Sequence, residues 1–593
     1  MTQILTNQIG YDCGDTKSAV LQAEGPMTLG EFQVIRVSDG AAVCSGSAVE
    51  QGTVDRWETG YYYTLRFDQV REPGKYYIQI SGNGETFRSF PFDIGENLLE
   101  LRMISAVGYY FKAQRPTGEF EAAERNLPFR GSKPGVFDLR QGRLDVRGGW
   151  YDATGDTGIH LSHLSHTTYF NPQQASFSAY VFFQVNDLLE ESGYPYYTLL
   201  KRRMLDEGMY GADFLMRMRA PSGTFFRTKD RAEAFLPVNT TRSIGYEFWN
   251  PTSRKGGGAY GEMEEIVDRS YEVSLRSGGG YAIAALAAAA RHTYPSDFSK
   301  EEYLNAAIAS FNYLLEHNKE YTNDGNCNLL DDYCALDAAV ELYKTTGEYD
   351  YLRKAEGFVQ KMLGKYVPLD DTMGYLSVDG TKRPFFHAAD AGMPVVNLLN
   401  FYRAAQEGGL RDQALELAEK LMRHQLSVTN EVSNPFGYAR QLIQHGNGTL
   451  ENQFFYPHDV ETAPWWQGEN ARLASLATAA RYLAWHTKDE AFQAELRKFA
   501  DDQINWVLGL NPYDACMVEG AGRNNNAYFF ECRKDFIHCP GGIVNGITGG
   551  LHDEHGIDFV SAPTEEIKDN WRWAEQWIPH GSWFIYALAM KKI

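Results

Sequence analysis

The feature that most constrains the fold of this chain is a change in the spacing of its apolar residues near Phe92. Before this point, short segments such as residues 30–37, 61–67 and 74–80 alternate apolar and polar positions between Gly, Pro and Asp turns. This alternation is typical of strands in a small antiparallel sandwich. After Phe92, apolar residues recur about every 3.6 positions, and this spacing predicts helices.

The 593 residues exceed what one hydrophobic core usually serves, so we expect at least two domains. A β-sandwich is predicted over residues 1–95 and an all-α domain over residues 96–593. The second domain should contain about twelve helices with hardly a strand between them. Its helices are predicted near residues 97–113, 175–192, 198–219, 274–292, 300–318, 330–346, 349–365, 387–405, 410–426, 468–485, 489–508 and 579–592. The Ala-rich run at 281–290 predicts a buried helix, because small side chains let neighbouring helices approach closely.

Charge and composition exclude several kinds of partner. The net charge of −21 disfavours nucleic acid and anionic membranes. No apolar run approaches the roughly 20 residues that cross a bilayer. The N-terminus lacks the basic cluster and apolar stretch of a secretory signal, so we expect a cytoplasmic protein unless the sequence was trimmed. The seven scattered cysteines favour free thiols, and the only zinc candidate is Cys532 with His538 and Cys539.

Two carboxylates in a Gly-rich turn carry the clearest chemical signal. Residues 148–156 read Gly-Gly-Trp-Tyr-Asp-Ala-Thr-Gly-Asp and place Asp152 and Asp156 close together. Paired acids can serve as general acid and base. Asp and Gly are also common in ordinary turns, so the spacing alone leaves a purely structural interpretation open.

Residues 148–156 resemble the GGW-x-DAGD motif of glycoside hydrolase family 9, with one residue extra between the two Asp. Residues 570–577 resemble the terminal NE motif of that family, with Glu575 at the place of its Glu and Ala574 where Asn is usual. Four further segments resemble family motifs in the same order, at residues 205–215, 331–335, 434–437 and 503–512. Residues 7–11 are similar to the opening of the Ig-like module that precedes many family 9 catalytic domains.

The resemblance implies an Ig-like β-sandwich followed by an (α/α)6 toroid, and an inverting hydrolase of β-1,4-linked glycans. In such an enzyme one carboxylic acid protonates the leaving oxygen, while a carboxylate roughly 6.5–9.5 Å away activates water. It implies Glu575 as the acid, Asp156 as the base and Asp152 as a helper that holds the water. No cofactor is required by this chemistry, and a structural calcium ion is left open.

Aromatic side chains in the long segments at 221–272, 427–467 and 511–578 are expected to line a cleft, because flat aromatic faces stack on sugar rings. Packing beneath the loops is the alternative for each of them. The residues predicted to bind substrate are Tyr151, His160, Trp465, Trp466, Tyr528, Trp573 and Trp577. His160, His163 and His166 recur every three residues, and for them a sugar contact or surface exposure is favoured over a metal site.

The finer substrate prediction rests on departures from the family pattern. The HHR signature that follows the NP turn in the family is replaced by residues 523–528, so the usual endo-cellulase subsite is not expected. The Ig-like module, the absent signal, the 152–156 turn and residues 169–174 together resemble the bacterial exo-β-D-glucosaminidases of the family. The acids Glu262, Glu264, Glu265, Asp268 and Asp390 are candidates to receive a glucosamine ammonium group.

The resemblance therefore implies a small oligosaccharide partner, with a lean toward chitosan oligosaccharides cleaved from one end. The alternatives are an endo-β-1,4-glucanase or cellodextrinase and, in another class, a non-catalytic glycan-binding protein on the same scaffold. A polysaccharide lyase is a more remote rival. The sequence does not reveal the oligomeric state.

Overall fold

The computed structural model of the protein describes residues 2–131, 136–163, 169–232, 236–246, 268–322, 324–460, 466–526, 538–560 and 570–591. It divides into two compact units. The first unit comprises Met1–Tyr109, Met422–Gln576 and Trp583–Lys591, and the second comprises Tyr110–Leu421, Trp577–Ser582 and Lys592–Ile593. Because the first unit joins the N-terminal strands to C-terminal helices, the expected boundary at residue 95 stays a prediction.

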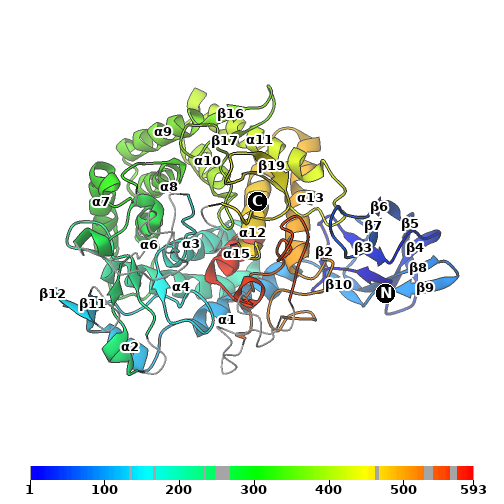
Figure 1. The fold of residues 1–593 in the computed structure, drawn as a ribbon, viewed down its shortest axis with the longest axis horizontal. Coiled ribbons are helices and arrows are strands. Elements are labelled where there is room, and N and C mark those ends of the chain that lie inside the picture. The colour runs from blue at the N-terminus through cyan, green and yellow to red at the C-terminus, as the bar shows by residue number, and fades with distance from the viewer. Residues whose placement is uncertain are drawn as a thin grey trace. The chain divides into compact units, whose positions relative to one another are not determined.

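The first unit begins with two packed β-sheets, drawn in blue in Figure 1. One sheet has the order β1-β3-β7-β6, and the other has the order β2-β10-β8-β4-β5 with β9 paired to β8. The strands are β1 Gln3–Leu5, β2 Tyr11–Asp12, β3 Ser18–Ala23, β4 Leu29–Arg36, β5 Ala42–Gly46, β6 Val49–Gly52, β7 Tyr61–Arg66, β8 Gly74–Gly82, β9 Glu85–Arg88 and β10 Phe92–Gly95. All pairings are antiparallel except that of β2 with β10.

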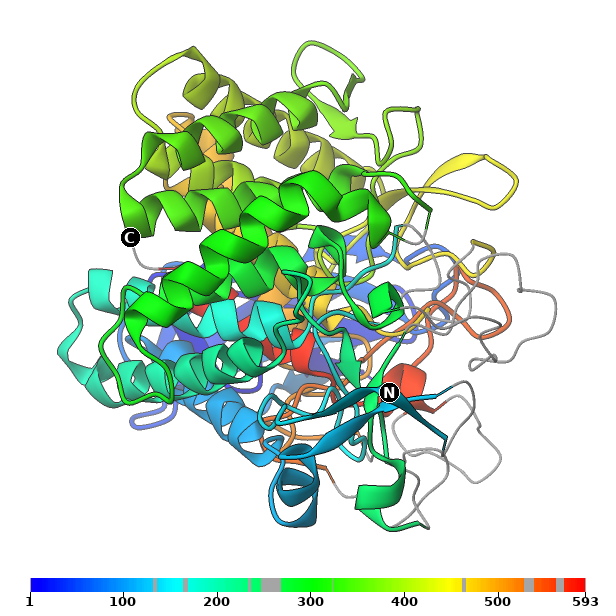
Figure 2. The same cartoon turned by 90° about the vertical axis from the view of Figure 1, so that its left-hand side faces the viewer.

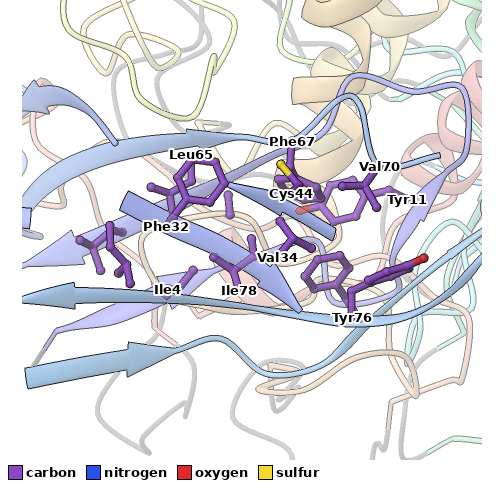
Figure 3. Close-up of a cluster of buried hydrophobic side chains, with 14 of the residues drawn as sticks. Ile4, Tyr11, Phe32, Val34, Cys44, Leu65, Phe67, Val70, Tyr76 and Ile78 are labelled. Atoms are coloured by element: carbon purple, nitrogen blue, oxygen red, sulfur yellow. The ribbon is translucent and has the colours of Figure 1, made fainter. Parts of the chain in front are cut away.

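The core of the sandwich follows the period-two pattern of the sequence. Along β8 the side chains of Tyr76, Ile78 and Ile80 are buried, while the residues between them are more exposed. Figure 3 shows Ile78 and Val34 from one sheet beside Leu65 from the other. Alternate residues of a strand point to the same face, so this alternation supplies one apolar face per sheet.

Helices and a hairpin complete the first unit. They are the π-helix Glu100–Ile104, α12 Asn470–Ala484, α13 Glu490–Val507, α14 Trp571–Ala574, β18 Gln441–Gln444 and β19 Leu450–Gln453. Three more helices, α1 Ser105–Ala113, α11 Gly409–Asn430 and α15 Ile578–Ala589, run from one unit into the other.

The sandwich is bonded to these helices at its N-terminal motif. Asn7 Oδ1 accepts hydrogen bonds from the backbone N–H groups of Ile9 and Gly10. Its Nδ2 donates to Asn505 Oδ1 on α13 at 2.8 Å. At the far end of the chain, Lys591 forms ion pairs with Asp12 and Asp15. All of these residues belong to the first unit, so its two ends in sequence are held together by polar contacts.

The second unit is built mainly from helices. They are α2 Glu119–Glu124, α3 Ala175–Glu191, α4 Thr198–Arg217, α5 Val238–Thr241, α6 Gly280–Ala289, α7 Lys300–His317, α8 Leu329–Thr346, α9 Tyr349–Leu363 and α10 Met393–Ala404. In Figure 2 the longer ones, cyan to green, run as neighbouring rods. Successive helices pack in pairs, α3 on α4 and α8 on α9, while α6 lies against α3, α7 and α8.

Helix ends and burial agree with the sequence. The helices predicted at 175–192, 330–346 and 349–365 are present to within two residues at each end. The helix α6 is buried along its whole length, as its Ala-rich sequence predicts. At α7, Ser299 and Glu302 form a reciprocal capping box, which satisfies backbone N–H groups of the first turn. No helix in the described ranges has both the length and the apolar character needed to cross a bilayer.

The second unit also contains strands that the sequence did not predict. Five short strands pair in the order β12-β11-β15-β14-β13. They are β11 Leu127–Arg130, β12 Phe137–Leu144, β13 Ile159–His160, β14 Thr228–Lys229 and β15 Ile244–Gly245, and a separate hairpin joins β16 Tyr366–Pro368 to β17 Gly374–Leu376. The expectation of hardly a strand was wrong here. Three of these strands, β13, β14 and β15, have two residues each and are too short to show an alternating pattern.

The sandwich core offers a direct test of the first unit. Leu65 is fully buried, so Leu65→Ala leaves a cavity and should lower the free energy of unfolding by about 2–5 kcal/mol. Val49 is 53% exposed in the same sandwich, and Val49→Ala should lower it by less than about 1 kcal/mol. Urea denaturation measures both values. An equal loss in the two variants would contradict this account of the core.

Candidate active site

The turn that carries Asp152 and Asp156 lies in the second unit, directly before β13. Gly149 has a φ of 78°, and a Cβ there would meet the Ile159 side chain at 2.9 Å. Only glycine fits such a conformation beside so close a neighbour. The turn folds back on itself, because Asp152 N–H donates to Gly158 C=O at 3.0 Å. Both carboxylates are thereby fixed to one rigid segment.

Asp156 is held as a carboxylate. Its Oδ1 accepts from the backbone N–H groups of Thr157 at 2.5 Å and Gly158 at 2.7 Å, and from Arg231 Nε at 2.9 Å. Its Oδ2 accepts from Arg231 Nη2. Burial opposes ionisation, but the Arg231 guanidinium and the Gly158 N–H outweigh it and hold the pKa of Asp156 below its usual value.

A fully buried ion cluster lies beneath the turn. Glu124, on α2, accepts from Lys229 Nζ at 2.8 Å and from Arg242 Nη2 at 2.7 Å, and all three side chains are 0% exposed. Lys229 Nζ also donates to Gly148 C=O at 2.6 Å, and Arg242 Nη1 donates to Thr157 C=O. Burial lowers the pKa of Lys229 to about 7, and Glu124 opposes that shift. The cluster thus fixes both ends of the turn.

His160 lies beside Asp152 as a neutral imidazole. Its Nδ1 shares a hydrogen bond with Thr228 Oγ1 at 2.6 Å, and Thr228 Oγ1 also lies 3.1 Å from Ile159 C=O. His160 Nε2 lies 3.7 Å from Asp152 Oδ2. Burial lowers the pKa of His160 to about 4, although Asp156 opposes this. This spacing between Nε2 and the carboxylate suits a bridging water or sugar hydroxyl.

Trp577 and Ile578 contact the turn within the second unit. Ala153 and Trp577 form an antiparallel bridge, and Ile578 N–H donates to Asp152 C=O at 2.9 Å. The Trp577 indole is buried, with His163 and His580 packed edge-on against it. The predicted sugar contact of Trp577 stays a prediction. Tyr151 is partly buried, with the Phe120 ring edge-on to it at 5.9 Å.

Glu575 belongs to the first unit, where a buried amide network orients its segment. Asn545 N–H donates to Glu575 C=O at 2.7 Å, and Asn545 Nδ2 donates to its carboxylate at 3.1 Å. The next residue, Gln576, accepts from Cys539 N–H at 2.9 Å and donates back to Cys539 C=O at 3.0 Å. Glu575 itself is only partly buried, so its carboxyl group is held without being sealed off.

The aromatic residues predicted to stack on sugars have other contacts in the first unit. Trp573 is 0% exposed and its Nε1–H donates to Thr548 Oγ1 at 2.9 Å. Trp466 stacks on His458 with ring centroids 3.8 Å apart, and Arg572 lies over the same indole at 4.1 Å. These contacts give both indoles a packing role, and their contact with sugar stays a prediction. Trp465 and Tyr528 lie outside the described residues.

The described residues do not bring together the acids that were expected to receive an ammonium group. Asp390 is 0% exposed and accepts from Gln173 N–H at 3.0 Å, which makes it part of the interior of the second unit. Glu262, Glu264, Glu265 and the side chain of Asp268 lie outside the described residues.

Within the described ranges, no group of three or more His, Cys, Asp or Glu side chains has the arrangement of a metal site. His160 Nδ1 is bonded to Thr228, and His166 lies outside these ranges. Of the zinc candidates, His538 Nδ1 pairs with Glu519 at 2.7 Å, and Cys532 is not among the described residues. The six described cysteines are free thiols. The structural calcium left open by the sequence stays untested.

Several residues that shape the site were not predicted. Contacts with the 148–157 turn or with Glu575 are made from far along the chain by Glu124, Lys229, Arg231, Arg242 and Asn545. Arg231, for example, reaches Asp156 across 75 residues. No local motif marks such contacts.

Comparison with known proteins defines the class. A model of glycosyl hydrolase family 9 matches residues 102–539, and a model of the cellulase N-terminal Ig-like domain matches residues 1–85. The chain belongs to glycosyl hydrolase family 9 and is an enzyme of that class, as predicted. Asp152 and Asp156 lie inside the matched range, whereas Glu575 lies beyond it.

Relatives and solved structures extend over nearly the whole chain. It is 22% identical to a cellodextrinase of Butyrivibrio fibrisolvens, over 93% of this chain and 92% of the relative. It is 24% identical to endoglucanase D of Acetivibrio thermocellus, over 99% of this chain and 83% of that one. A family 9 structure from Bacteroides ovatus matches with a TM-score of 0.65 at 17% identity, covering 99% and 98% of the two chains. A metagenome-derived family 9 endoglucanase matches with a TM-score of 0.64 at 18% identity, over 100% and 99%.

These matches confirm the predicted fold class, an Ig-like sandwich followed by a helical catalytic domain of family 9. The finer resemblance to exo-β-D-glucosaminidases is not shown by them, since the relatives are named as a cellodextrinase and as endoglucanases.

The buried ion cluster gives a matched pair of variants on one helix. Glu124→Gln leaves Lys229 and Arg242 without their carboxylate, so the free energy of unfolding should fall by about 3–5 kcal/mol. Glu121 also lies on α2 but pairs with Arg125 in solvent. Glu121→Gln should therefore change stability by no more than about 0.5 kcal/mol. Thermal and urea unfolding measure the stability of both variants. Equal losses of stability in the two variants would contradict the role of the cluster.

Proposed function

We propose that this chain is an inverting glycoside hydrolase that cleaves short β-1,4-linked glucan oligosaccharides. Asp156 serves as the general base, Glu575 as the general acid, and Asp152 with His160 holds the attacking water. The observation that carries the proposal is the contact of the buried Asp156 carboxylate with Arg231, which lowers the pKa of Asp156. An ionised base is what an inverting hydrolase needs on the water side of the bond.

The roles divide along the chemistry of one step. Water loses a proton to Asp156 as its oxygen bonds to the anomeric carbon. The bond from that carbon to the glycosidic oxygen breaks, and this oxygen takes a proton from Glu575. His160 stays neutral near pH 7, so it does not compete with Glu575 as the acid.

Glu575 is proposed as the acid because it takes the place of the Glu in the terminal motif of the family. The rigid hold of Asn545 on Glu575 suits a group that must deliver a proton in a fixed direction.

Glucan oligosaccharides are favoured over glucosamine oligomers. The relatives that match over most of this chain are named as a cellodextrinase and an endoglucanase. Among the acids predicted to bind an ammonium group, Asp390 is described by the structure. Its side chain is enclosed in the interior of the second unit. Burying an ammonium without a carboxylate partner is costly, so a neutral sugar fits the described residues better.

The catalytic roles have a direct test. Asp156→Asn and Glu575→Gln should each lower kcat by at least about a hundredfold, because each removes a proton transfer from the reaction. Asp145→Asn, a change of an exposed carboxylate before the turn, should keep the wild-type rate. Near wild-type rates in both main variants would contradict the assignment. Proton NMR should show the α anomer as the first product from a β-glycoside, and a β anomer would exclude inversion.

The substrate has a separate test with a panel of oligosaccharides. Purified protein is incubated with cello-oligosaccharides, chito-oligosaccharides and chitosan oligosaccharides of two to six sugars, and the products are separated by chromatography. The expected result is a kcat/KM for cello-oligosaccharides at least about tenfold above that for the charged oligomers. Preference for chitosan oligomers would instead support an exo-β-D-glucosaminidase. Binding of oligomers without any cleavage would support the non-catalytic alternative.

A further inference from the structure

The contact between Arg231 and Asp156 leaves the two carboxylate oxygens unequal. Oδ1 accepts three hydrogen bonds, from the N–H groups of Thr157 and Gly158 and from Arg231 Nε. Oδ2 accepts one from Arg231 Nη2, and no other donor to it is found in the described part of the chain. An ionised carboxylate has about four lone-pair sites, so Oδ2 keeps capacity for a further donor.

The chain holds Arg231 in place from both sides. The N–H of Asp230, the preceding residue, donates to Ser243 C=O at 2.8 Å. The N–H of Ala232, the following residue, donates to Thr157 Oγ1 at 3.2 Å. Thr157 is the neighbour of Asp156 itself, so the backbone around Arg231 is tied to the segment that its side chain serves.

The burial of the two partners is uneven. The Asp156 side chain is 8% exposed, whereas the Arg231 side chain is 38% exposed. A guanidinium that solvent can reach is a poor stabiliser of the fold, because water screens much of its attraction. It can still favour the charged form of the carboxylate that it touches.

The other charged and titratable groups around Asp156 do not replace Arg231. His160 is neutral above about pH 4. Asp152, on the same turn, is a carboxyl group and supplies no positive charge. Arg242 donates to the backbone C=O of Thr157 and pairs with Glu124. Arg231 is therefore the cation in direct contact with the carboxylate among the described residues.

We propose that Arg231 is a positioning residue that keeps Asp156 ionised and leaves Oδ2 as the atom that takes the proton from water. The proposal rests on the role of Asp156 as general base. In the cleavage step the proton passes from water to Oδ2, the water oxygen bonds to the anomeric carbon, and the leaving oxygen takes its proton from Glu575. The Arg231 guanidinium keeps all of its protons throughout.

The pH dependence of activity tests this role. A base works only when deprotonated, so loss of Arg231 should raise the pH at which activity fails on the acidic side. In Arg231→Gln the acidic limb of kcat/KM on cellotetraose should move up by about one to two pH units. Arg231→Lys keeps a positive charge without the two-pronged contact, and its limb should move less. A lower rate with an unmoved acidic limb in Arg231→Gln would overturn the proposal.

The matched control is Arg403, which pairs with Glu191 at 3.2 Å on the surface of the same unit. Arg403→Gln removes an equal charge far along the chain from the turn, so its pH profile should overlie that of the wild type. A shift as large as that of Arg231→Gln would mean that net charge, and not contact, sets the profile, and would overturn the proposal.

A second measurement needs no substrate and so separates this inference from the proposed function. Thermal unfolding at pH 7 is compared for Arg231→Gln, Asp156→Asn and the double variant. If the two side chains act as a pair, the change in Tm of the double variant should differ from the sum of the two single changes. Additive changes would overturn the pairing even if the wild type cleaves its substrate.

Discussion

The site of the second unit depends on the ion pairs that Glu124 forms with Lys229 and Arg242. The Glu124 carboxylate is sealed from solvent and accepts from both Lys229 and Arg242. These two cations continue to the C=O groups of Gly148 and Thr157, at either end of the turn that carries the acids. A buried charge that loses its partner is severely penalised, so the turn cannot relax without breaking the cluster. The geometry of the acids is thus held by an ionic lock beneath them.

A second ion pair lies nearer to solvent and has a different consequence. Lys229 and Glu124 are fully enclosed, whereas Arg231 is partly exposed where it meets Asp156. Water weakens the contribution of an exposed pair to stability, but the pair still favours one protonation state over the other. The enclosed cluster fixes the backbone, and the exposed pair sets the charge on the side chain.

Much of the fold could be predicted from the sequence, because alternation in the sandwich and the Ala-rich helix α6 are local patterns. The paired Asp and Glu575 were found through motifs, and their roles stay predictions. The strands β13 and β14 have two residues each and show no periodicity. Arg231 meets Asp156 across 75 residues, a distance that no local pattern spans. Composition could not distinguish an aromatic residue that stacks on a sugar from one that packs in the core. Trp573 is an example, because it is buried and its indole N–H donates to Thr548 Oγ1.

The ion pairs of Lys591 with Asp12 and Asp15 join residues that lie far apart in the sequence. Asp12 and Lys591 are separated by 579 residues. At a synthesis rate of about 5–20 residues per second, the sandwich would wait roughly half a minute to two minutes for this partner to emerge from the ribosome. Its acids must stay hydrated through that interval. The sandwich is therefore synthesised long before the residue that completes its ion pairs.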